Sequence, residues 1–430
     1  MSRTTKTILP AKSLHGCIQL PGDKSISHRV ALIGSISEGA TELENYPDSA
    51  DCRSTLSCLG QLGVEIAFQG QRLVLEGRGL GGLKAPEKPL DAGNSGTTAR
   101  LLAGILAGHS FSSTLSGDFS LSKRPMDRVV DPLLKFGARI DAVDGNRLPL
   151  YIEGGDLIGI DYTLKVASAQ VKSAILFAGL HASGKTLIKE STLTRDHTEI
   201  SLAQSGSKII FGGGQIEILG EKPLEGRSIK IPGDISSAAF LISAALLLPH
   251  SHLRLENVGV NPTRSTYLSL LERIGAGIQM GPTQIHGGEV VGDINVMHST
   301  LGRIEISRAL VTGLIDELPI LAIIGTKCRG GLTLRGAQEL RLKESDRINA
   351  LVTNLRKVGI SVEEFSDGFS FDGPQVVEGG AVGSFGDHRI AMAFAIAGLI
   401  SKSGIEIEDA ECVEVSYPNF FEVLEGMVDR

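Results

Sequence analysis

Lysine, arginine, serine and histidine gather where a strand-like pattern runs into a helix-like pattern. In the segment LPGDKSISHR, residues Lys24, Ser25, His28 and Arg29 follow an alternating stretch and a Pro-Gly-Asp step. Ser25 and Arg29 are four residues apart, which places them on one face of a helix. The first backbone N–H groups of a helix lack intrahelical partners and attract anions. We therefore predict an anion-binding site here; the alternative is a capped helix with a solvated basic turn.

Two acidic residues lie among cations, an arrangement suited to proton transfer. Asp316 lies in IDELP and Glu344 in LRLKESDRI. An addition followed by an elimination needs one group that takes a proton and one that returns it. A helix over the second segment would place Lys343 and Arg347 four residues apart, where like charges repel unless an anion lies between them. The alternatives are a helix cap ahead of Pro319 for Asp316 and a solvated charged helix face for the second segment.

Further cations occur in the short motifs SKRPMDR, LTRDHTE and FGDHRIAM, and we count them as candidates for anion binding: Lys123, Arg124, Arg128, Arg195 and Arg389. In LTRDHTE, the spacing of Asp196 and Glu199 fits a helix-capping pattern, which predicts a structural role for Asp196.

Two segments match nucleotide-binding patterns in the wrong context. GLHASGKT, at Gly179–Thr186, has the letters of a phosphate-binding P-loop, which must follow a strand and open a helix. Here a helix-like pattern precedes it and a strand-like pattern follows, so we predict a helix-to-strand turn. GRGLGG, at Gly77–Gly82, is followed by LKAPEKP, where no helix can begin. We therefore predict a loop there and no nucleotide site at either place.

The elements that would position these residues recur along the chain. The segment Ile18–Ile33 returns in altered form at Ile229–Ala244, about half the chain later. Similar strand-to-helix starts are spaced about 70 residues apart and can be marked by Ser25, Ser95, Ala169, Ser236, Asp316 and Asp387. Runs of Ala, Gly and Ser follow Gly22, Gly93 and Gly386, which predicts closely packed, buried helices. Six units of two helices and several strands would form two domains.

Length and composition indicate a soluble globular protein and exclude several other classes. With 430 residues, 42% hydrophobic and 21% charged, the chain has the composition of two globular domains. A net charge of −7 and the lack of tryptophan argue against nucleic-acid binding. Five scattered cysteines fit a reducing cytosol better than disulfides or a zinc site. Apolar runs are too short to span a bilayer, so we expect a cytoplasmic protein without membrane insertion.

The chain resembles the EPSP synthase family over essentially its whole length. The ordered motifs that carry the resemblance are PGDKSISHR, DAGNSGTTAR, KRPMDR, SAQVKSA, RDHTE, DELP, LRLKESDR and GDHRIAM. The resemblance implies a two-domain inside-out α/β barrel, each domain having three βαβαββ units around buried helices. One domain would comprise residues 21–231 and the other residues 1–20 and 232–430, with crossovers near residues 20 and 231.

The resemblance also implies an activity and its residues. Members of this family transfer the enolpyruvyl group of phosphoenolpyruvate to the 5-hydroxyl of shikimate 3-phosphate, through a tetrahedral intermediate. Residues implied for shikimate 3-phosphate, mainly in the first domain, are Lys24, Ser25, Arg29, Ser168, Ala169 (through its backbone), Gln170, Arg195, Asp316 and Lys343. Those implied for phosphoenolpyruvate are Lys24, Gly96, Arg124, Gln170, Arg347 and Arg389. Asp316, Glu344 and Lys24 would be catalytic, with the order of the two carboxylates in proton transfer left open.

Other expectations follow from the same resemblance. The reaction needs no metal or organic cofactor, the enzyme is expected to be a monomer, and closure of the domains would exclude water. Val415 departs from the lysine that many relatives carry before the step corresponding to Ser416-Tyr417-Pro418, so one contact to phosphoenolpyruvate is in doubt. Gly96 is retained, and a side chain there crowds the inhibitor glyphosate in this family. We therefore expect glyphosate to inhibit this protein.

Two alternatives stay open on the sequence. A sister enzyme with the same fold transfers enolpyruvate to UDP-N-acetylglucosamine, but its mobile loop normally carries a reactive cysteine and the segment 110–124 contains none. The second alternative is a non-catalytic anion-binding protein on this scaffold. Asp316 and Glu344 argue against it, because binding alone would not require acids among so many cations.

Overall fold

The chain is divided between two structural units, each with its own hydrophobic core. The computed structural model describes residues 4–143 and 146–430, so the first three residues of the predicted segment 1–20 lie outside it, as do residues 144–145. Unit 1 comprises Met1–Pro21, Gly233–Gln284 and Val290–Arg430. Unit 2 comprises Gly22–Pro232 together with the short segment Ile285–Glu289. The units are described separately below.

Unit 2 contains the same four-stranded sheet three times. The strand orders are β16 (Ser228–Lys230), β3 (Ala40–Glu44), β5 (Arg72–Glu76), β4 (Glu65–Gln69); β6 (Leu90–Asp91), β7 (Ser112–Ser116), β9 (Arg147–Glu153), β8 (Arg139–Val143); and β11 (Asp161–Thr163), β13 (Lys185–Lys189), β15 (Gln215–Leu219), β14 (Ile209–Gly212). In each sheet the first pair is parallel and the other two are antiparallel. The first sheet takes β16 from the far end of the unit's main segment.

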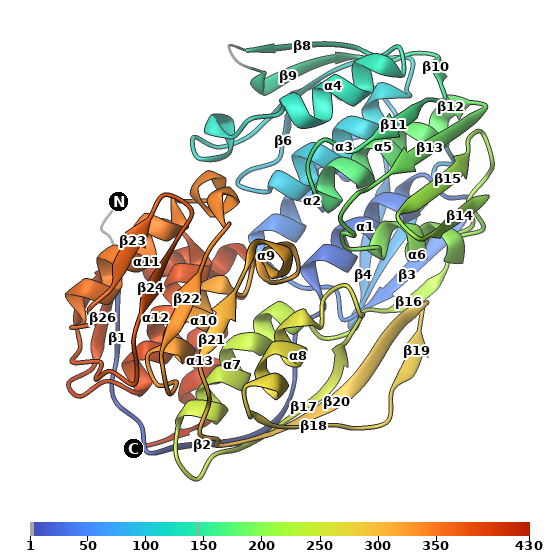
Figure 1. The fold of residues 1–430 in the computed structure, drawn as a ribbon. Helices are drawn as coiled ribbons and strands as arrows, with labels where there is room; N and C mark the ends of the chain where they lie inside the picture. Colours follow the sequence, from blue (N-terminus) through green and yellow to red (C-terminus); the bar gives the residue numbers. More distant parts are fainter. Residues whose placement is uncertain (1–3, 144–145) are drawn as a thin grey trace. The chain divides into compact units, whose positions relative to one another are not determined.

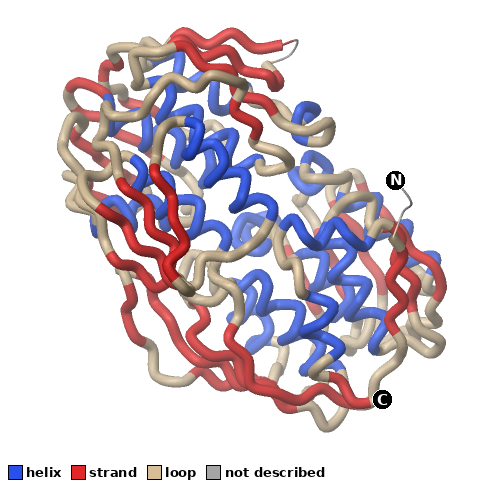
Figure 2. The backbone as a smooth tube through the Cα atoms, turned by 180° about the vertical axis from the view of Figure 1, so that it is seen from behind, coloured by secondary structure: helices blue, strands red, loops and turns tan. Residues whose placement is uncertain are grey.

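Three helices form the interior of unit 2, and the strands lie outside them (Figures 1 and 2). They are α1 (Lys24–Ser35), α3 (Gly96–Ala107) and α5 (Ala169–His181), and nearly all their residues are buried. Small residues allow close packing: a Cβ on Gly104 of α3 would lie 2.2 Å from the backbone oxygen of Ala174 in α5. The second helix of each repeat is α2 (Ala50–Gln61), α4 (Asp127–Lys135) or α6 (His197–Gln204).

Unit 1 repeats this arrangement around α7 (Ile235–Leu247), α10 (Leu318–Gly325) and α12 (His388–Leu399). Its first sheet contains β2 (Ser13–Gln19), β17 (His252–Gly259), β18 (Gly277–Met280), β19 (Gln284–His286), β20 (Glu289–Met297) and β27 (Val428–Asp429). Its second sheet contains β21 (Ile304–Ile306), β22 (Leu332–Leu334), β24 (Gly368–Phe371) and β23 (Glu363–Phe365). Between the strands lie α8 (Thr266–Arg273), α9 (Arg308–Leu314) and α11 (Arg347–Lys357).

The sixth repeat differs from the other five in its second half. After β25 (Gly380–Gly383), α12 and β26 (Ile405–Glu408), the chain forms the 3-10 helix η3 (Ala410–Val415) and α13 (Phe420–Glu425) where the other repeats have a hairpin. Strand β1 (Thr5–Ile8), from the beginning of the chain, pairs antiparallel with β26. The third sheet of unit 1 is therefore completed by a segment that is distant in sequence.

Several expectations from the sequence are confirmed. The α/β class is confirmed, and the helices that follow Gly22, Gly93 and Gly386 are buried. In GLHASGKT, α5 ends at His181, the two-residue strand β12 (Ala182–Ser183) follows, and β13 begins at Lys185, so this segment leads from a helix into strands as predicted. GRGLGG is a loop. Among the helices of the described residues, none has both the length and the apolar character needed to cross a membrane.

Candidate active site

The buried helices of unit 2 begin at one common end. Asp23 caps α1 by accepting from the N–H of Ile26 at 2.9 Å, and Ser95 caps α3 by accepting from the N–H of Thr98 at 3.1 Å. Ser168 is the cap residue of α5, and its hydroxyl accepts from the N–H of Val171 at 3.4 Å. The positive ends of three helix dipoles and their first amides therefore face one region, which favours anions.

Hydrogen bonds between the early turns fix these helix starts together. His28 Nδ1 of α1 lies 2.7 Å from Thr55 Oγ1 of α2, and that hydroxyl lies 2.6 Å from Thr98 Oγ1 of α3. Arg29 Nη2 donates to Ser173 Oγ of α5 at 3.0 Å. Buried polar contacts between the first two turns of these helices therefore hold the three helix N-termini next to one another.

Arginine residues of two elements lie beside Ser25. Arg195, just before α6, donates from Nη1 to Ser25 Oγ at 3.4 Å, and Arg29 donates to the Ser25 carbonyl at 2.8 Å. Arg29 Nε also donates to Thr198 Oγ1 at 2.7 Å. Burial, followed by the nearby charge of Arg195, lowers the pKa of Arg29 to about 10. Two guanidiniums held this close would be stabilised by an anion beside them.

A second group of polar side chains surrounds the start of α3. Gln170 Oε1 accepts from Arg100 Nη1 at 3.1 Å, and Gln170 Nε2 donates to Thr97 Oγ1 at 3.0 Å. A Cβ on Gly96 would lie 2.5 Å from Arg100 Nη1 and 3.4 Å from Arg124 Nη1. Gly96, Gln170 and Arg124 are thus brought together, with Arg100 between them.

Lys24, the first residue of α1, forms an ion pair that the sequence did not indicate. Its Nζ lies 2.8 Å from Asp51 Oδ2 in the first turn of α2, and both side chains are largely buried. A carboxylate at this point holds the ammonium in place, and an ammonium group has three N–H donors in all.

In unit 1 the centre of the predicted site is Arg347. Its Nε donates to Asp387 Oδ2 at 2.7 Å, its Nη2 donates to Glu344 Oε2 at 2.7 Å, and its Nη1 lies 3.8 Å from Asp316 Oδ1. The Arg347 side chain is 1% exposed. Burial alone would lower its pKa, but the charges of Asp387 and Glu344 raise the pKa of Arg347 above its usual range. It therefore remains a cation shared by several carboxylates.

Arg389 joins this cluster from the start of α12. Its Nη1 donates to Ser236 Oγ at 2.6 Å and to the backbone oxygen of Asp316 at 2.9 Å, and its Nε lies 3.8 Å from Asp316 Oδ1. Asp316 thus lies between the two guanidiniums, with a side chain that is 16% exposed. A carboxylate so placed is accessible to solvent and oriented by cations, as a proton-transfer group requires.

The two units differ in what occupies their helix starts. In unit 1 the cap positions of α7, α10 and α12 are all acidic: Asp234, Glu317 and Asp387. Two of the three caps in unit 2 are serines, and the cations Lys24, Arg29, Arg100, Arg124 and Arg195 lie around them. Unit 2 therefore has the chemistry of an anion receptor, whereas unit 1 combines cations with carboxylates.

One local prediction was wrong, and two capping assignments differ from the structure in detail. The segment Leu340–Ile348 is not one helix: the 3-10 helix η2 (Gln338–Leu342) ends before Lys343, and α11 begins at Arg347. Asp346 causes this break, because its carboxylate accepts from the N–H of Asn349 at 3.0 Å and caps α11. Lys343 and Arg347 are therefore not one helical turn apart. The alternative interpretation of Asp316 as a helix cap does not hold, because the cap position of α10 is Glu317. Asp196 does lie at the cap position of α6, as the capping pattern predicts, although its side chain makes no capping bond.

The remaining predicted residues lie close to these elements. Ser168 and Ala169 are half-buried at the start of α5, and Lys343 is half-buried between η2 and α11. Val415 ends η3 and is also half-buried. Within the ranges 4–143 and 146–430, no group of three or more His, Cys, Asp or Glu side chains is arranged to hold a metal ion.

Sequence reasoning missed three residues that complete the clusters. Asp51 pairs with Lys24, Arg100 contacts Gln170, and Asp387 accepts from Arg347. Arg100 and Asp387 lie within the motifs DAGNSGTTAR and GDHRIAM. Their position in these motifs could have identified them as site residues. No sequence motif could have identified Asp51, because only the packing of α2 against α1 brings it to Lys24.

Buried His28 gives the protein a predicted sensitivity to acid. Burial, then the charges of Lys24 and Arg29, hold the pKa of His28 well below its usual value. Below a pH of about 6.5 the unfolded chain binds a proton that the folded state does not. The free energy of unfolding should therefore fall as the pH is lowered from about 6.5, by at most about 1.4 kcal/mol per pH unit for this group. His28→Asn, followed by urea unfolding from pH 7.5 to 5, should flatten this dependence.

The matched control is the exposed His252, where His252→Asn should leave the slope unchanged. An unchanged slope in His28→Asn would contradict the assignment of a neutral, buried imidazole at position 28.

Comparison with known proteins identifies the family to which this arrangement belongs. A family model described as EPSP synthase (3-phosphoshikimate 1-carboxyvinyltransferase) matches residues 8–424. Proteins named 3-phosphoshikimate 1-carboxyvinyltransferase from Alkaliphilus metalliredigens (strain QYMF) and Solibacter usitatus (strain Ellin6076) are each 48% identical to this chain. The first alignment covers 97% of this chain and 98% of the relative, and the second covers 99% and 100%. A solved EPSP synthase from Acinetobacter baumannii has a TM-score of 0.88 and 40% identity, covering 99% of this chain and 98% of that one.

Proposed function

The chain belongs to the EPSP synthase family, and on this basis we propose that it is a 3-phosphoshikimate 1-carboxyvinyltransferase. It transfers the enolpyruvyl group of phosphoenolpyruvate to the 5-hydroxyl of shikimate 3-phosphate and releases phosphate. The product leads to chorismate and the aromatic amino acids. The observation with the most weight is the pair of clusters: an anion receptor at three helix N-termini in unit 2, and two carboxylates on shared arginines in unit 1.

The chemistry is an addition followed by an elimination. The 5-hydroxyl oxygen bonds to C2 of phosphoenolpyruvate and loses its proton, while the C3 methylene gains a proton and becomes a methyl group. In the second step that methyl group loses a proton, the C2–C3 double bond re-forms and the C2–O bond to phosphate breaks. Asp316 and Glu344 exchange these protons, and Lys24 stabilises the charge on the transferred group.

We assign the binding roles by charge and position. Shikimate 3-phosphate is held in unit 2 by Ser25, Arg29, Arg195 and the start of α5 at Ser168, Ala169 and Gln170, with Lys24, Lys343 and Asp316 also contacting it. Phosphoenolpyruvate is held by Lys24, Gly96, Arg124, Gln170, Arg347 and Arg389. Forked guanidiniums and helix N-termini suit phosphate and carboxylate groups. Because these residues belong to both units, we propose that closure of two domains, 21–231 and the remainder, completes the site.

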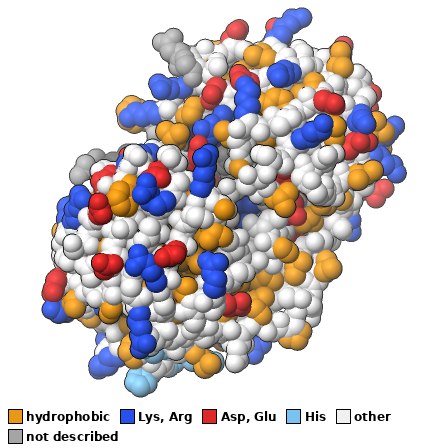
Figure 3. Space-filling model, in the orientation of Figure 1, with side chains coloured by type: hydrophobic (Ala, Val, Ile, Leu, Met, Phe, Trp, Pro, Cys, Tyr) orange, Lys and Arg blue, Asp and Glu red, His pale blue; other side chains and the backbone are white. Residues whose placement is uncertain are grey.

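The remaining properties are proposed on the same basis. We propose a cytoplasmic monomer that works without a metal or organic cofactor and without nucleic-acid or membrane partners. The net charge of −7 supports the lack of a nucleic-acid partner. On the face visible in Figure 3, Lys and Arg side chains are interspersed with Asp and Glu, which also argues against a nucleic-acid partner on that face.

The decisive test measures phosphate release from phosphoenolpyruvate with two acceptors in parallel. We expect release with shikimate 3-phosphate and none with UDP-N-acetylglucosamine. Release only with the sugar nucleotide would instead assign the sister activity. No release with either acceptor, in a folded protein that binds shikimate 3-phosphate, would indicate a binding protein.

Gly96 predicts inhibition by glyphosate and a route to resistance. A Cβ at Gly96 would lie 2.5 Å from Arg100 Nη1 and 3.4 Å from Arg124 Nη1, so it would occupy space next to both guanidiniums. Gly96 is the first residue of α3, where alanine fits the backbone. We expect Gly96→Ala to raise the glyphosate concentration for half-inhibition by about tenfold or more, an energy of about 1.4 kcal/mol. The measurement is turnover against glyphosate at fixed phosphoenolpyruvate.

Gly60→Ala, in α2 with open space around its Cβ position, is the control and should keep wild-type sensitivity. Wild-type turnover that persists in millimolar glyphosate would overturn the expected inhibition.

A further inference from the structure

The turn between β19 and β20 lies in the segment Ile285–Glu289 of unit 2 and packs against α6 of the same unit. Gly287 and Gly288 form this turn with φ angles of +55° and +86°. A Cβ on Gly288 would lie 2.7 Å from Ile200 Cγ2 and 3.0 Å from Gln204 Cγ, both in α6. Glycine at position 288 therefore meets two requirements at once, a left-handed backbone and a close approach to a helix.

Glu289, the residue after this turn, is bonded to the first residue of α6. Its Oε1 lies 2.7 Å from Nδ1 of His197, and the two side chains are 4% and 1% exposed. An ionised carboxylate only accepts hydrogen bonds, so the Nδ1–H group donates. Because both groups are buried, removal of the carboxylate would leave a buried imidazole N–H without this acceptor.

The residues next to His197 hold the arginines of the proposed acceptor site. Thr198 Oγ1 accepts from Arg29 Nε at 2.7 Å and lies 2.6 Å from Ser173 Oγ. Two residues before His197, Arg195 donates to Ser25 Oγ at 3.4 Å. A small rotation or shift of the first turn of α6 would therefore move both arginines relative to Ser25.

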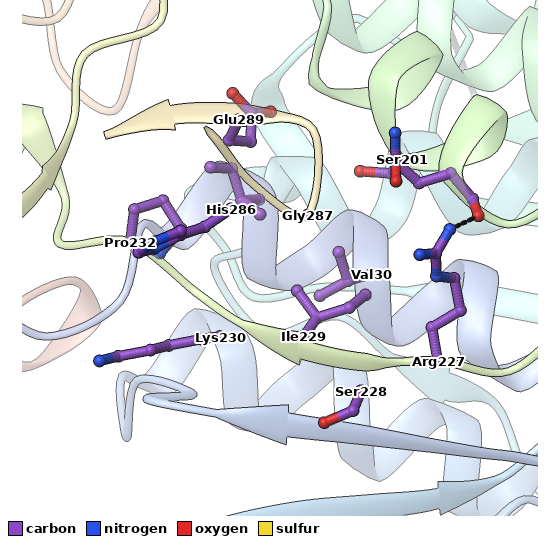
Figure 4. A pocket seen from close by; sticks show the side chains of 12 residues that line it. Val30, Ser201, Arg227, Ser228, Ile229, Lys230, Pro232, His286, Gly287 and Glu289 are labelled. Carbon is purple, nitrogen blue, oxygen red and sulfur yellow. Dashed lines mark hydrogen bonds between the residues drawn. The ribbon is translucent and has the colours of Figure 1, made fainter. Parts of the chain in front are cut away.

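A cavity lies next to the turn, so fewer side chains support the turn on that side. It has a volume of about 140 Å³, and its lining includes His286, Gly287 and Glu289 of the turn, Ser201 and Gln204 of α6, and Val30 of α1. Figure 4 shows the turn on one side of this space and Ile229 of β16 on another. Side chains do not fill this side of the turn, and the Glu289 bond and the Gly288 contact are two points at which the turn meets α6.

We propose that Glu289 is a positioning residue for shikimate 3-phosphate, acting through His197 and the first turn of α6. The Glu289–His197 bond and the close contact at Gly288 fix the start of α6, and with it the positions of Arg195 and Arg29. This inference rests on the proposed function of the same site. It adds a residue that is not among the binding residues assigned above and that lies outside the motifs that carry the resemblance.

The test uses two independent changes at the turn in the full-length protein. Glu289→Ala removes the carboxylate, and Gly288→Ala pushes the turn away from Ile200 and Gln204. Each should raise the Kd for shikimate 3-phosphate, measured by calorimetry without phosphoenolpyruvate, by about 5- to 30-fold. The KM for shikimate 3-phosphate should rise in parallel, with kcat at saturation within about twofold of wild type. Glu289→Gln keeps an acceptor oxygen and should recover part of the affinity.

Two controls separate positioning from general loss of stability. Gly70→Ala introduces the same left-handed strain, at φ +65°, in a turn where the Cβ meets open space. Ser243→Ala removes a buried hydroxyl that lies 2.8 Å from Tyr267 Oη in unit 1. Both should lower thermal stability without changing the Kd.

Each outcome bears on one hypothesis. Unchanged Kd values in folded Glu289→Ala and Gly288→Ala would overturn the positioning role while the proposed function stands. Failure of the wild-type protein to bind shikimate 3-phosphate at all would instead count against the proposed function. If Glu289→Ala does not fold, Gly288→Ala and Glu289→Gln carry the test alone.

Discussion

Asp316→Asn should lower kcat by about 10²- to 10⁴-fold, the usual contribution of a positioned acid or base. The amide has the shape of the carboxylate but cannot accept a proton under these conditions. The backbone oxygen of Asp316 still accepts from Arg389, so the turn between α9 and α10 keeps its position. Shikimate 3-phosphate should still bind through unit 2. Single-turnover kinetics and calorimetry measure the two effects separately.

The control for this change is Glu305→Gln, which neutralises an exposed carboxylate of the same unit, 3.2 Å from Arg303. It should leave kcat unchanged. Retention of more than about a tenth of wild-type kcat by Asp316→Asn would rule out a proton-transfer role for Asp316.

Arg347→Met should have a large effect on both the stability of the protein and its KM for phosphoenolpyruvate. The side chain is 1% exposed and pairs with Asp387, which is 0% exposed. Removing one partner of a buried ion pair leaves the other charge uncompensated, which typically costs about 3–5 kcal/mol. The remaining carboxylates, Glu344 and Asp316, would also lose a cation. We expect a reduced free energy of unfolding by urea denaturation and a sharply raised KM for phosphoenolpyruvate.

Arg303→Met is the matched control, because it removes an arginine whose side chain is 44% exposed and which pairs with Glu305. Exposed pairs contribute about 0–1 kcal/mol, so this variant should be close to wild type. Wild-type stability in Arg347→Met would show that the buried carboxylates do not depend on this guanidinium.

The sequence predicted the parts of the fold that depend on local pattern. Runs of small residues after Gly93 and Gly386 predicted buried helices, and the order of patterns around GLHASGKT predicted a turn in place of a nucleotide loop. Both are properties of a short window of sequence. The prediction failed at Leu340–Ile348, where charge spacing suggested one helix. There a single capping bond from Asp346 sets the start of α11, and spacing cannot show which of several polar residues will cap.

Contacts between distant segments could not be predicted from spacing. Asp51 reaches Lys24 because α2 packs on α1, and Glu289 reaches His197 because a turn near residue 287 lies on α6. Neither pair shares a motif or a period. The candidate arginines and acids, by contrast, could be identified from the sequence. They lie in motifs next to predicted helix starts, and the direction of the chain already places these residues at the N-terminal end of each helix.

The strand pairings imply an unusual order of assembly during synthesis. Strand β3 pairs with β16, so the first sheet of unit 2 is complete only after residue 230 has been made. Strand β2 must wait for β17, and β1 must wait for β26 near residue 405. Pairings of such large sequence separation are slow to form, and unpaired strand edges are prone to aggregate. The segments that contain β1 and β2 are therefore made well before their partner strands, and chaperones can act on them in that interval.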